Sequence, residues 1–372
     1  PRPISKLGVI GGGTMGSGIT IAALNSGLPV TMVERDQESL ERGIENVKKV
    51  YRRDVEKGRL SQEKADKILS NYSTSTHLKD LSDKDMIIEA VFEELDVKKG
   101  VFSQLNDIAK EGAVLASNTS YLDIDKIASA TDRVGDVIGL HFFSPANIMR
   151  LLEIVVPTNV KDDVVATGFQ LAKILKKVPV RAGNCDGFIG NRVLENYAKA
   201  ANYMMEDGTS PYDIDKAIVE FGYPMGPFQM FDLAGGDIGW ADRKRKAAFR
   251  SNEERYVSIA DRICEKGWFG QKTGRGYYKY TPGARRGEED PEVLSIIQEE
   301  RKVKGIEAKS LSSDEIRRRY FAAMVNEGAK VLEEKMALRP SDIDVTKLFG
   351  YGFPRHMGGP MRYADVYGIE NI

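Results

Sequence analysis

The chain has 372 residues, of which 41% are hydrophobic and 29% are charged, and its charges nearly cancel to a formal net charge of −1. This length allows two or three domains with ordinary cores. The lack of a basic excess argues against nucleic acid as a main partner. Two cysteines exclude a disulfide framework and suit a reducing compartment. No apolar run approaches the roughly 18 residues of a membrane span.

The N-terminal segment carries a short apolar run, then the pattern G-x-G-x-x-G, then helix-compatible residues. This order predicts a strand, a tight turn and the start of a helix. In such a turn Gly11 permits the bend, Gly13 lets the backbone approach a pyrophosphate, and Gly16 lets the helix pack against the strand. The N–H groups of the first helical turn, where Thr14 and Met15 lie, then face the phosphates.

A second expected strand, at residues 30–33, ends in Glu34, which lies 18 residues after Gly16. Near this spacing a carboxylate meets the ribose hydroxyls of NAD. Its charge would also repel the 2′-phosphate of NADP. The motif therefore predicts NAD as the cofactor, and a glycine turn without a ligand is the alternative.

Residues 7 to 182 alternate between apolar runs and stretches rich in Glu, Lys, Ala and Leu. This alternation predicts an α/β domain with a parallel, doubly wound, Rossmann-like sheet. The charged segment 40–69 exceeds a normal crossover, so we expect a helical pair there. The expected strands lie at residues 8–10, 30–33, 86–90, 114–117, 137–140 and 152–155.

Beyond residue 180 helical patterns dominate, and we expect helices at residues 191–206 and 213–221. Two later stretches share one pattern. Asp213-Ile214-Asp215 precedes a Gly-Tyr-Pro-Met-Gly-Pro run with Asp232 beyond it, and Asp342-Ile343-Asp344 precedes a similar run with Asp365 beyond it. A repeat at one period indicates duplication. We therefore expect an NAD-binding domain at residues 1–183, a helical domain at 184–281, a linker at 282–309 and a second, degenerate helical copy at 310–372.

Several runs of the chain, in order, resemble the 3-hydroxyacyl-CoA dehydrogenase family. They are Ile88-Glu89-Ala90-Val91-Phe92-Glu93, Ala116-Ser117-Asn118-Thr119-Ser120, Gly139-Leu140-His141-Phe142-Phe143-Ser144-Pro145, Gly187-Phe188-Ile189-Gly190-Asn191-Arg192 and Lys272-Thr273-Gly274-Arg275-Gly276-Tyr277-Tyr278. With the second helical copy, the chain resembles the dehydrogenase half of a multifunctional fatty-acid β-oxidation enzyme. The other half of such enzymes is an enoyl-CoA hydratase/isomerase, which we expect to precede Pro1.

Oxidation of a secondary alcohol requires a base, and an imidazole titrates near neutral pH. The resemblance implies that His141 is this base, that Glu153 orients it, and that Ser120 and Asn191 hydrogen-bond the substrate. Glu153 lies in an apolar run, where a carboxylate is costly to bury unless it is paired. The alternatives are a structural histidine, an exposed strand-end glutamate and ordinary helix caps. The other two histidines, His77 and His356, are expected to be structural.

The resemblance places Glu93 and Lys98 near the nicotinamide and its ribose, and Asn118 and Ser144 along the same cleft. Ser144 stands where short family members have an asparagine. No metal site is expected.

Arg52 and Arg53 lie on the long charged segment, where the family uses a lysine to meet CoA. Arginine suits phosphate at least as well, and a solvated charged face is the alternative.

The implied function is NAD-dependent oxidation of (3S)-3-hydroxyacyl-CoA to 3-oxoacyl-CoA in fatty-acid β-oxidation. A 6-phosphogluconate-type dehydrogenase is disfavoured by Glu34 and by the His141 and Glu153 pair. A catalytically weak, NAD-binding structural relative stays open. Short family members dimerise through their helical domains, so the tandem copies predict a monomer with an internal pseudo-dimer. We expect the protein in the bacterial cytoplasm or the eukaryotic peroxisome, and not outside the cell.

Overall fold

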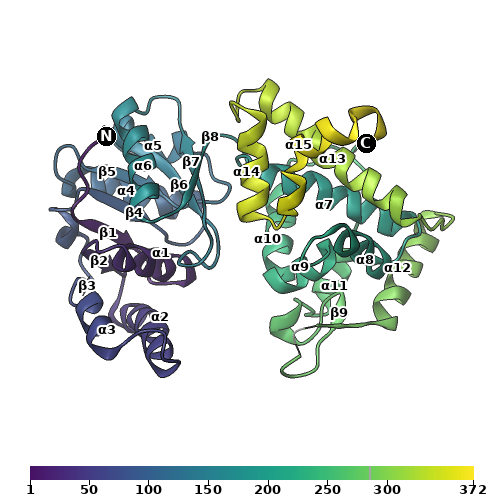
Figure 1. Ribbon diagram of the computed structural model, residues 1–372, viewed down its shortest axis with the longest axis horizontal. Helices are drawn as coiled ribbons and strands as arrows, with labels where there is room; N and C mark the ends of the chain where they lie inside the picture. Colours follow the sequence, from purple (N-terminus) through teal and green to yellow (C-terminus); the bar gives the residue numbers. More distant parts are fainter. Residues whose placement is uncertain (285) are drawn as a thin grey trace. The chain divides into compact units, whose positions relative to one another are not determined.

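The computed structural model describes residues 1–284 and 286–372 and divides into two compact units, whose elements are labelled in Figure 1. The first unit comprises residues 1–192 and 328–351, and the second comprises 193–327 and 352–372. This division differs from the four expected segments, because residues 328–351 pack with the sheet rather than with the other helices. The chain changes unit within two long helices, α7 (Gly190–Asp207) and α13 (Ser313–Glu333).

The first unit is built on an eight-stranded sheet with the order β3-β2-β1-β4-β5-β6-β7-β8. Neighbouring strands are parallel except β6 and β7, which are antiparallel. This topology confirms the Rossmann-like prediction and adds one reversed pair. The strands are β1 (Leu7–Ile10), β2 (Val30–Val33), β3 (Tyr72–Ser75), β4 (Met86–Glu89), β5 (Val114–Ser117), β6 (Val137–Phe142), β7 (Leu151–Val156) and β8 (Val178–Gly183).

Helices cover both faces of this sheet. Gly168 of α6 (Asp162–Ile174) packs on Ile138 and Leu140, whereas Gly139 faces Ile124 of α5 (Ile124–Ala128). Because successive residues of a strand point to opposite faces, these two helices lie on opposite sides of β6. The remaining helices of this unit are α1 (Thr14–Asn25), α2 (Gln37–Glu56), α3 (Gln62–Leu69), α4 (Leu95–Ile108) and α14 (Pro340–Gly350). The expected helical pair is therefore present as α2 and α3.

Within the eight-stranded sheet, the sequence patterns missed the two outermost strands, β3 and β8. The strand β3 has the polar sequence YSTS and is only partly buried, and β8 contains Pro179 and Arg181. An edge strand pairs on one side only, so it tolerates a proline and needs less apolar sequence. The central strands β1, β4 and β5 are buried throughout and carry the continuous apolar runs typical of parallel sheets.

The second unit is mainly helical. Besides parts of α7 and α13, its helices are α8 (Pro211–Phe221), α9 (Pro227–Ala234), α10 (Gly236–Ala247), α11 (Ile259–Glu265), α12 (Pro291–Lys304) and α15 (Pro360–Tyr367), and a hairpin joins β9 (Tyr278–Lys279) to β10 (Glu288–Glu289). The expectation of a linker at 282–309 was wrong for α12. That helix buries Val293, Ile296 and Ile297 with a spacing typical of an amphipathic helix. Among the described residues of both units, the short 3₁₀ turns are η1 (Leu78–Leu81), η2 (Val134–Asp136), η3 (Gln271–Thr273), η4 (Arg355–Met357) and η5 (Ile369–Asn371).

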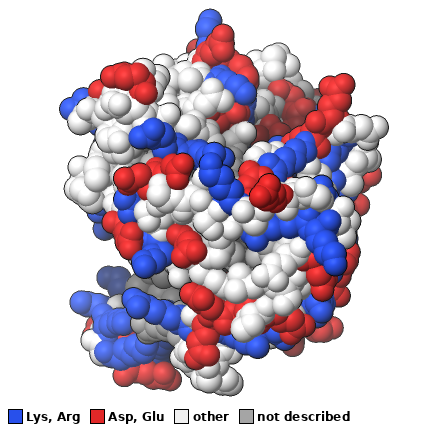
Figure 2. All heavy atoms as spheres, turned by 90° about the vertical axis from the view of Figure 1, so that its right-hand side faces the viewer, with Lys and Arg blue, Asp and Glu red and all other residues white. Residues whose placement is uncertain are grey.

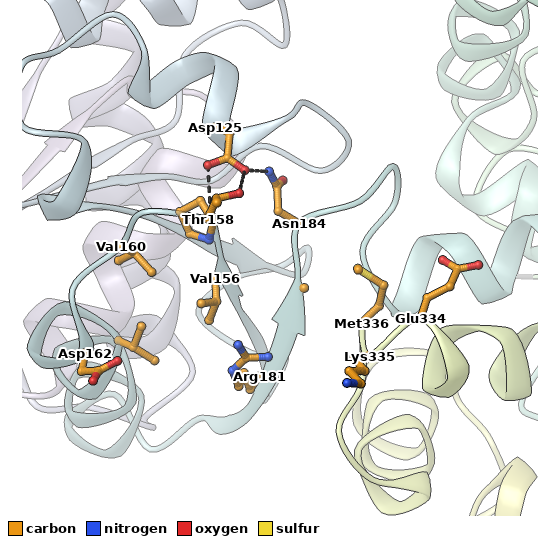
Figure 3. A pocket seen from close by; sticks show the side chains of 13 residues that line it. Asp125, Val156, Thr158, Val160, Asp162, Arg181, Asn184, Glu334, Lys335 and Met336 are labelled. Carbon is orange, nitrogen blue, oxygen red and sulfur yellow. Dashed lines mark hydrogen bonds between the residues drawn. The ribbon is translucent and has the colours of Figure 1, made fainter.

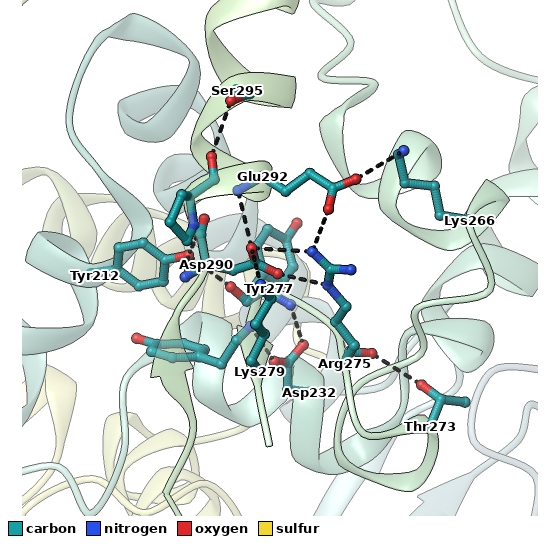
Figure 4. A network of polar contacts seen from close by, with 12 residues as sticks. Tyr212, Asp232, Lys266, Thr273, Arg275, Tyr277, Lys279, Asp290, Glu292 and Ser295 are labelled. Carbon is teal, nitrogen blue, oxygen red and sulfur yellow. Dashed lines mark hydrogen bonds and ion pairs between the residues drawn. The ribbon is translucent and has the colours of Figure 1, made fainter. Parts of the chain in front are cut away.

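Two buried aspartates organise the second unit (Figure 4 shows the surroundings of Asp232). The carboxylate of Asp232 accepts the N–H groups of Tyr277 and Tyr278, each at 2.9 Å. The carboxylate of Asp215 accepts the N–H of Phe228 at 2.9 Å and the hydroxyl of Tyr278 at 2.7 Å. The family-like run around residues 272–278 is therefore used here to satisfy buried carboxylates.

The two stretches that share a sequence pattern also share local structure. The helices α8 and α14 each have 11 residues and begin at a proline, and α9 and α15 each have 8 residues and begin at a proline. The glycines that end the shorter pair have nearly the same backbone angles, φ 102° and ψ 119° at Gly235 and φ 94° and ψ 122° at Gly368. One difference is that Asp232 is buried whereas Asp365 is exposed.

Within residues 1–284 and 286–372, no helix is both long and apolar enough to cross a membrane. On the face shown in Figure 2, basic and acidic side chains are interspersed. This mixture agrees with the near-zero net charge.

Candidate active site

The glycine loop between β1 and α1 has the geometry that its sequence predicts. Gly11 has a φ of +104°, and a Cβ atom there would lie 2.6 Å from the carbonyl oxygen of Ala90. A Cβ atom at Gly16 would lie 1.8 Å from the carbonyl oxygen of Gly11, so helix and turn meet only because both residues are glycine. A Cβ atom at Gly13, in contrast, would meet no atom within 4 Å. The openness at Gly13 leaves room for a ligand.

The N-terminus of α1 is available to an anion. Gly13 is the N-cap, and no side chain caps this end of the helix. Thr14 is exposed and Met15 is half-buried at the start of the helix. An uncapped helix N-terminus presents free N–H groups and the positive end of the helix dipole. The loop therefore fits the pyrophosphate of a dinucleotide.

Glu34 lies beside this loop, directly after β2. Its Oε1 atom accepts the N–H of Gly12 at 2.7 Å. The side chain is half-buried, so one carboxylate oxygen is held by the turn while the residue still reaches solvent. Glu34, which is predicted to bind the ribose, thus lies next to the glycine loop, which is predicted to bind the pyrophosphate.

A buried charged cluster follows β4. The ammonium group of Lys98 is 2.6 Å from Glu89 Oε1 and 3.3 Å from Glu93 Oε2. Ser117 donates to Glu89 Oε2 at 2.6 Å. Lys98 and Glu89 are almost fully buried, whereas Glu93 is partly exposed. The predicted pair Glu93 and Lys98 is therefore joined, and Lys98 contacts carboxylates rather than the surface.

Sequence reasoning missed Glu89 and Ser117 as members of this site. The signal available was a carboxylate that ends the apolar strand Met86–Glu89. A buried carboxylate requires partners, and here a lysine and a serine supply them.

The loop after β5 is held by Glu93 and Asn118. Glu93 Oε1 accepts the hydroxyl of Thr119 at 2.6 Å and the N–H of Ser120 at 2.8 Å. Asn118 Oδ1 accepts the N–H of Phe142 at 3.0 Å, which ties this loop to the end of β6. Ser120 is half-buried. Its position is set by backbone contacts, so its hydroxyl is free to serve another partner.

The strands β6 and β7 bring His141 and Glu153 together as directly opposite residues of the antiparallel pair. His141 Nδ1 lies 2.7 Å from Glu153 Oε2. The other carboxylate oxygen, Oε1, accepts the N–H groups of Ile189 at 3.1 Å and Gly190 at 2.8 Å. These donors lie at the start of α7, so the positive end of that helix stabilises the buried carboxylate.

The imidazole of His141 is held at Nδ1 and is buried among aromatic side chains. Its ring packs against Phe143 at 4.3 Å and Phe188 at 5.6 Å between centroids. Nε2 makes no hydrogen bond with any of the described residues. With Nδ1 bound to the carboxylate, the tautomer that leaves a lone pair on Nε2 is favoured. The group can therefore accept a proton at Nε2.

Asn191 is the second residue of α7 and is half-buried. Its Oδ1 atom accepts the hydroxyl of Tyr351 at 2.8 Å, and its Nδ2 atom lies 3.5 Å from the carbonyl oxygen of Ser120. The structure thus brings Asn191 to the predicted Ser120. Like Glu89 and Ser117, Tyr351 is a residue that sequence reasoning did not connect with the site.

The loop after β6 carries Ser144, which is exposed and precedes a cis proline, Pro145. The ammonium of Lys177 donates to the carbonyl oxygens of Ala146 at 2.5 Å and Met149 at 2.6 Å, and holds this loop. Burial lowers the pKa of Lys177 to about 8.

The remaining predicted residues make none of the contacts described above. Arg52 and Arg53 are exposed on α2, and Arg52 pairs with Glu45 of the same helix. His77 and His356 are exposed, as expected for histidines outside the site.

A separate cavity of about 520 Å³ lies in the first unit (Figure 3). Asp125 accepts the N–H of Thr158 and the amide of Asn184, both at 2.9 Å, and these three residues line the cavity together with Arg181 and Met336. None of the predicted site residues lines it.

Comparison with known proteins matches two adjoining family models to the chain. The model of the 3-hydroxyacyl-CoA dehydrogenase NAD-binding domain covers residues 6–185, and that of the 3-hydroxyacyl-CoA dehydrogenase C-terminal domain covers residues 187–280. A peroxisomal bifunctional enzyme from Danio rerio is 42% identical over the whole chain, and the human one is 41% identical. The chain spans about half the length of these curated relatives, 53% in both cases.

Solved structures agree with this assignment. The dehydrogenase part of multifunctional enzyme 1 from C. elegans has a TM-score of 0.68 at 32% identity and covers 96% of this chain and 81% of its own. A 3-hydroxybutyryl-CoA dehydrogenase from Escherichia coli has a TM-score of 0.85 at 24% identity, covers 100% of this chain and 93% of its own, and supports the fold. The chain therefore belongs to the 3-hydroxyacyl-CoA dehydrogenase family, and its first domain is the NAD-binding domain of that family.

Proposed function

We propose that this chain oxidises (3S)-3-hydroxyacyl-CoA to 3-oxoacyl-CoA in fatty-acid β-oxidation. The observation that carries the proposal is the His141–Glu153 pair, in which a buried carboxylate is bound by the first turn of α7 and holds the imidazole by Nδ1. Relatives named as fatty acid β-oxidation multifunctional proteins, such as one from Arabidopsis thaliana at 38% identity, support the substrate class.

The residues of the site divide the work of the reaction. His141 Nε2 accepts the proton of the 3-hydroxyl group, and Glu153 stabilises the imidazolium that forms. The Asn191 amide and the Ser120 hydroxyl hydrogen-bond the substrate oxygen as charge develops on it. NAD, held over the glycine loop, would supply the acceptor for the hydride that leaves C3.

The residues that would hold the cofactor follow the strands β1, β2, β4, β5 and β6. Gly11, Gly13, Thr14, Met15 and Gly16 form the pyrophosphate cradle at the start of α1. Glu34, whose carboxylate accepts the N–H of Gly12, is placed to bind the ribose hydroxyls. Glu93, Asn118 and Ser144 lie near the nicotinamide end, and Lys98 acts there by neutralising and orienting Glu93, because its ammonium group is buried between Glu89 and Glu93. Arg52 and Arg53 supply positive charge for the phosphates of CoA.

The test is the loss of NADH absorbance when acetoacetyl-CoA is added to the wild-type chain and to His141→Ala. Removal of a general base lowers the rate by roughly 10²–10⁴, while the dissociation constant of NADH, followed by fluorescence, stays near the wild-type value. The matched control is His77→Ala, which removes an exposed histidine and should leave the rate unchanged. Full turnover in His141→Ala would assign the base to another group. A wild-type chain that binds NADH without turnover would favour a structural relative.

We further propose that residues 310–372 are a degenerate copy of the helical domain and that the chain is a monomer with an internal pseudo-dimer. The equal helix lengths and the matching glycine angles of the two stretches support the duplication. Within one chain this pairing avoids the entropic cost of association. Light scattering on the intact chain should report the monomer mass, and a dimer through residues 310–372 would contradict it.

The names of the relatives also suggest a place in the cell and a larger protein. The vertebrate relatives are named peroxisomal, and a relative from Brassica napus is named glyoxysomal. We propose a peroxisomal location if the source is a eukaryote and a cytoplasmic one if it is a bacterium. Because the chain spans only half of these relatives, we propose an enoyl-CoA hydratase/isomerase half as its natural partner.

A further inference from the structure

Tyr351 follows α14 directly and lies outside both stretches that match the family models, which end at residue 280. It belongs to the same compact unit as the sheet and His141. Its hydroxyl donates to Asn191 Oδ1 at 2.8 Å across 160 residues of sequence. A residue far from the recognised domains is therefore in direct contact with a residue of the candidate active site.

The ring of Tyr351 is held by the same aromatic group that surrounds the histidine. It meets Phe143 edge-on at 5.5 Å between centroids, and Phe143 packs on His141 at 4.3 Å. The ammonium group of Lys347 lies 3.7 Å from the centroid of the Tyr351 ring. Edge-on aromatic pairs and cation–π contacts both have preferred directions, so the hydroxyl of Tyr351 has a defined position.

The first turn of α7 packs closely against the segment that carries Lys347 and Tyr351. A Cβ atom at Gly190 would lie 2.3 Å from the Tyr351 hydroxyl, so only glycine allows the close approach. Lys347, which is nearly fully buried, donates to the carbonyl oxygen of Gly190 at 3.1 Å. The N–H of the same residue binds Glu153 at 2.8 Å. The C-terminal segment thus packs on the turn that holds the carboxylate of the dyad.

The segment is also fastened to the sheet near Glu153. Gly183, at the end of β8, donates its N–H to the carbonyl oxygen of Met336 at 2.7 Å. A Cβ atom at Gly350 would lie 2.4 Å from Leu151 Cδ2, and Leu151 opens the strand that carries Glu153. Both contacts fix the position of this segment relative to β7 and β8.

In the structure the Asn191 amide has its Oδ1 atom toward the Tyr351 hydroxyl. Because Oδ1 accepts from the tyrosine, Nδ2 is turned toward the Ser120 loop. Its distance of 3.5 Å from the Ser120 carbonyl oxygen is at the outer limit of a hydrogen bond. The amide therefore keeps most of its donor capacity for a ligand.

We propose that Tyr351 is a positioning residue of the active site, which fixes the Asn191 amide so that Nδ2 donates to the oxygen of the acyl-CoA substrate. This inference rests on the proposed role of Asn191 in substrate binding. It assigns to the C-terminal segment, residues 328–351, a part in the reaction in addition to its part in packing.

The test is a double-mutant cycle of Tyr351→Phe and Asn191→Ala, assayed with acetoacetyl-CoA and NADH. The phenylalanine keeps the ring and its contact with Phe143 and removes only the hydroxyl. Loss of one such hydrogen bond should lower kcat/KM roughly 3- to 10-fold. The dissociation constant of NADH and the pH dependence of the rate should stay unchanged, because His141 and Glu153 are untouched. The double variant should be no slower than Asn191→Ala.

The control is Tyr367→Phe, which removes an exposed hydroxyl from α15 and should change nothing. If Asn191→Ala lowers activity while Tyr351→Phe is fully active, the positioning role is overturned and the proposed function stands. The role is also overturned if the two losses multiply in the double variant. Full activity of Asn191→Ala would show instead that the proposed function misassigned Asn191, and the inference would fall with it.

Discussion

The two carboxylate oxygens of Glu153 bind different partners, and one of these partners is His141. Its Oε2 atom lies 2.7 Å from His141 Nδ1, and its Oε1 atom accepts two backbone N–H groups from the first turn of α7. Both oxygens are therefore acceptors, and the side chain is completely buried. The dyad depends on a helix that belongs to the C-terminal part of the chain as much as on the two strands.

This division predicts the effect of Glu153→Gln. A glutamine that keeps its oxygen on the backbone N–H donors must turn its NH₂ group toward His141 Nδ1. Nδ1 then has to accept, which places the ring proton on Nε2 and removes the lone pair that the base needs. Loss of a hydrogen bond to a charged group costs about 1.5–3 kcal/mol, so kcat should fall roughly 10- to 100-fold. The pH dependence of the rate should also change, because the imidazolium loses its negative neighbour. An unchanged pH–rate profile would contradict the dyad, and Glu111→Gln, at an exposed glutamate, is the control.

A pair of glycine variants separates folding from cofactor binding. Gly13→Ala places its methyl group in open space, so the protein should unfold at the wild-type temperature. The same methyl group should obstruct the pyrophosphate and weaken NADH binding at least 10-fold. Gly16→Ala forces a methyl group to 1.8 Å from the Gly11 carbonyl oxygen, so it should lower the unfolding temperature as well. Calorimetry and fluorescence titration measure the two effects, and equal stability losses in both variants would contradict the loop geometry.

Glu34 should determine the choice between NADH and NADPH. The wild-type chain should bind NADH far more tightly, because the carboxylate repels a 2′-phosphate. Glu34→Ala should bring the dissociation constants of NADH and NADPH closer together, because NADH binds more weakly and NADPH more tightly. Comparable affinities for the two cofactors in the wild-type chain would show that Glu34 does not face the ribose.

The buried aspartates of the second unit predict a pH dependence of stability. Burial raises the pKa of Asp215 from its usual value of 3.8 to about 7 and that of Asp232 to about 6. Between about pH 4 and pH 7 the folded chain therefore binds more protons than the unfolded chain, so the stability of this unit should fall as the pH rises through that window. Ion-paired carboxyls such as Asp85, whose pKa is lowered, titrate below it.

Thermal unfolding at pH 5 and pH 7.5 measures this effect. The transition of the second unit should lie at lower temperature at the higher pH. The variant Asp232→Asn should flatten the dependence, because it removes one of the two titrating groups. A transition that moves upward between these two values would show that the hydrogen bonds to the carboxylates outweigh their burial.

Local sequence patterns predicted those parts of the fold in which neighbouring residues decide the structure. The glycine spacing of residues 11–16 predicts the turn, because Gly11 has a φ of +104° and a Cβ atom at Gly16 would lie 1.8 Å from the Gly11 carbonyl oxygen. The buried strands Val30–Val33 and Val114–Ser117 were predicted at their observed bounds, because burial on both faces favours a largely apolar run. The edge strand Tyr72–Ser75 was missed because its sequence is polar. The helix Pro291–Lys304 was missed because charged residues interrupt its apolar pattern.

The candidate site was predicted only as far as the family-like motifs reach. His141, Glu153, Ser120 and Asn191 were named from such motifs, and the structure joins His141 to Glu153 and Asn191 to Ser120. Their roles stay predictions until the variants are measured. The sequence by itself determined the cofactor loop and the central strands, because these follow from local sterics and periodicity, whereas the acid–base residues were named from the resemblance of their motifs to the family. Only the tertiary structure decided that Lys98 is neutralised by Glu89 and that Tyr351 orients Asn191, because contacts between residues far apart in the chain depend on how whole elements pack.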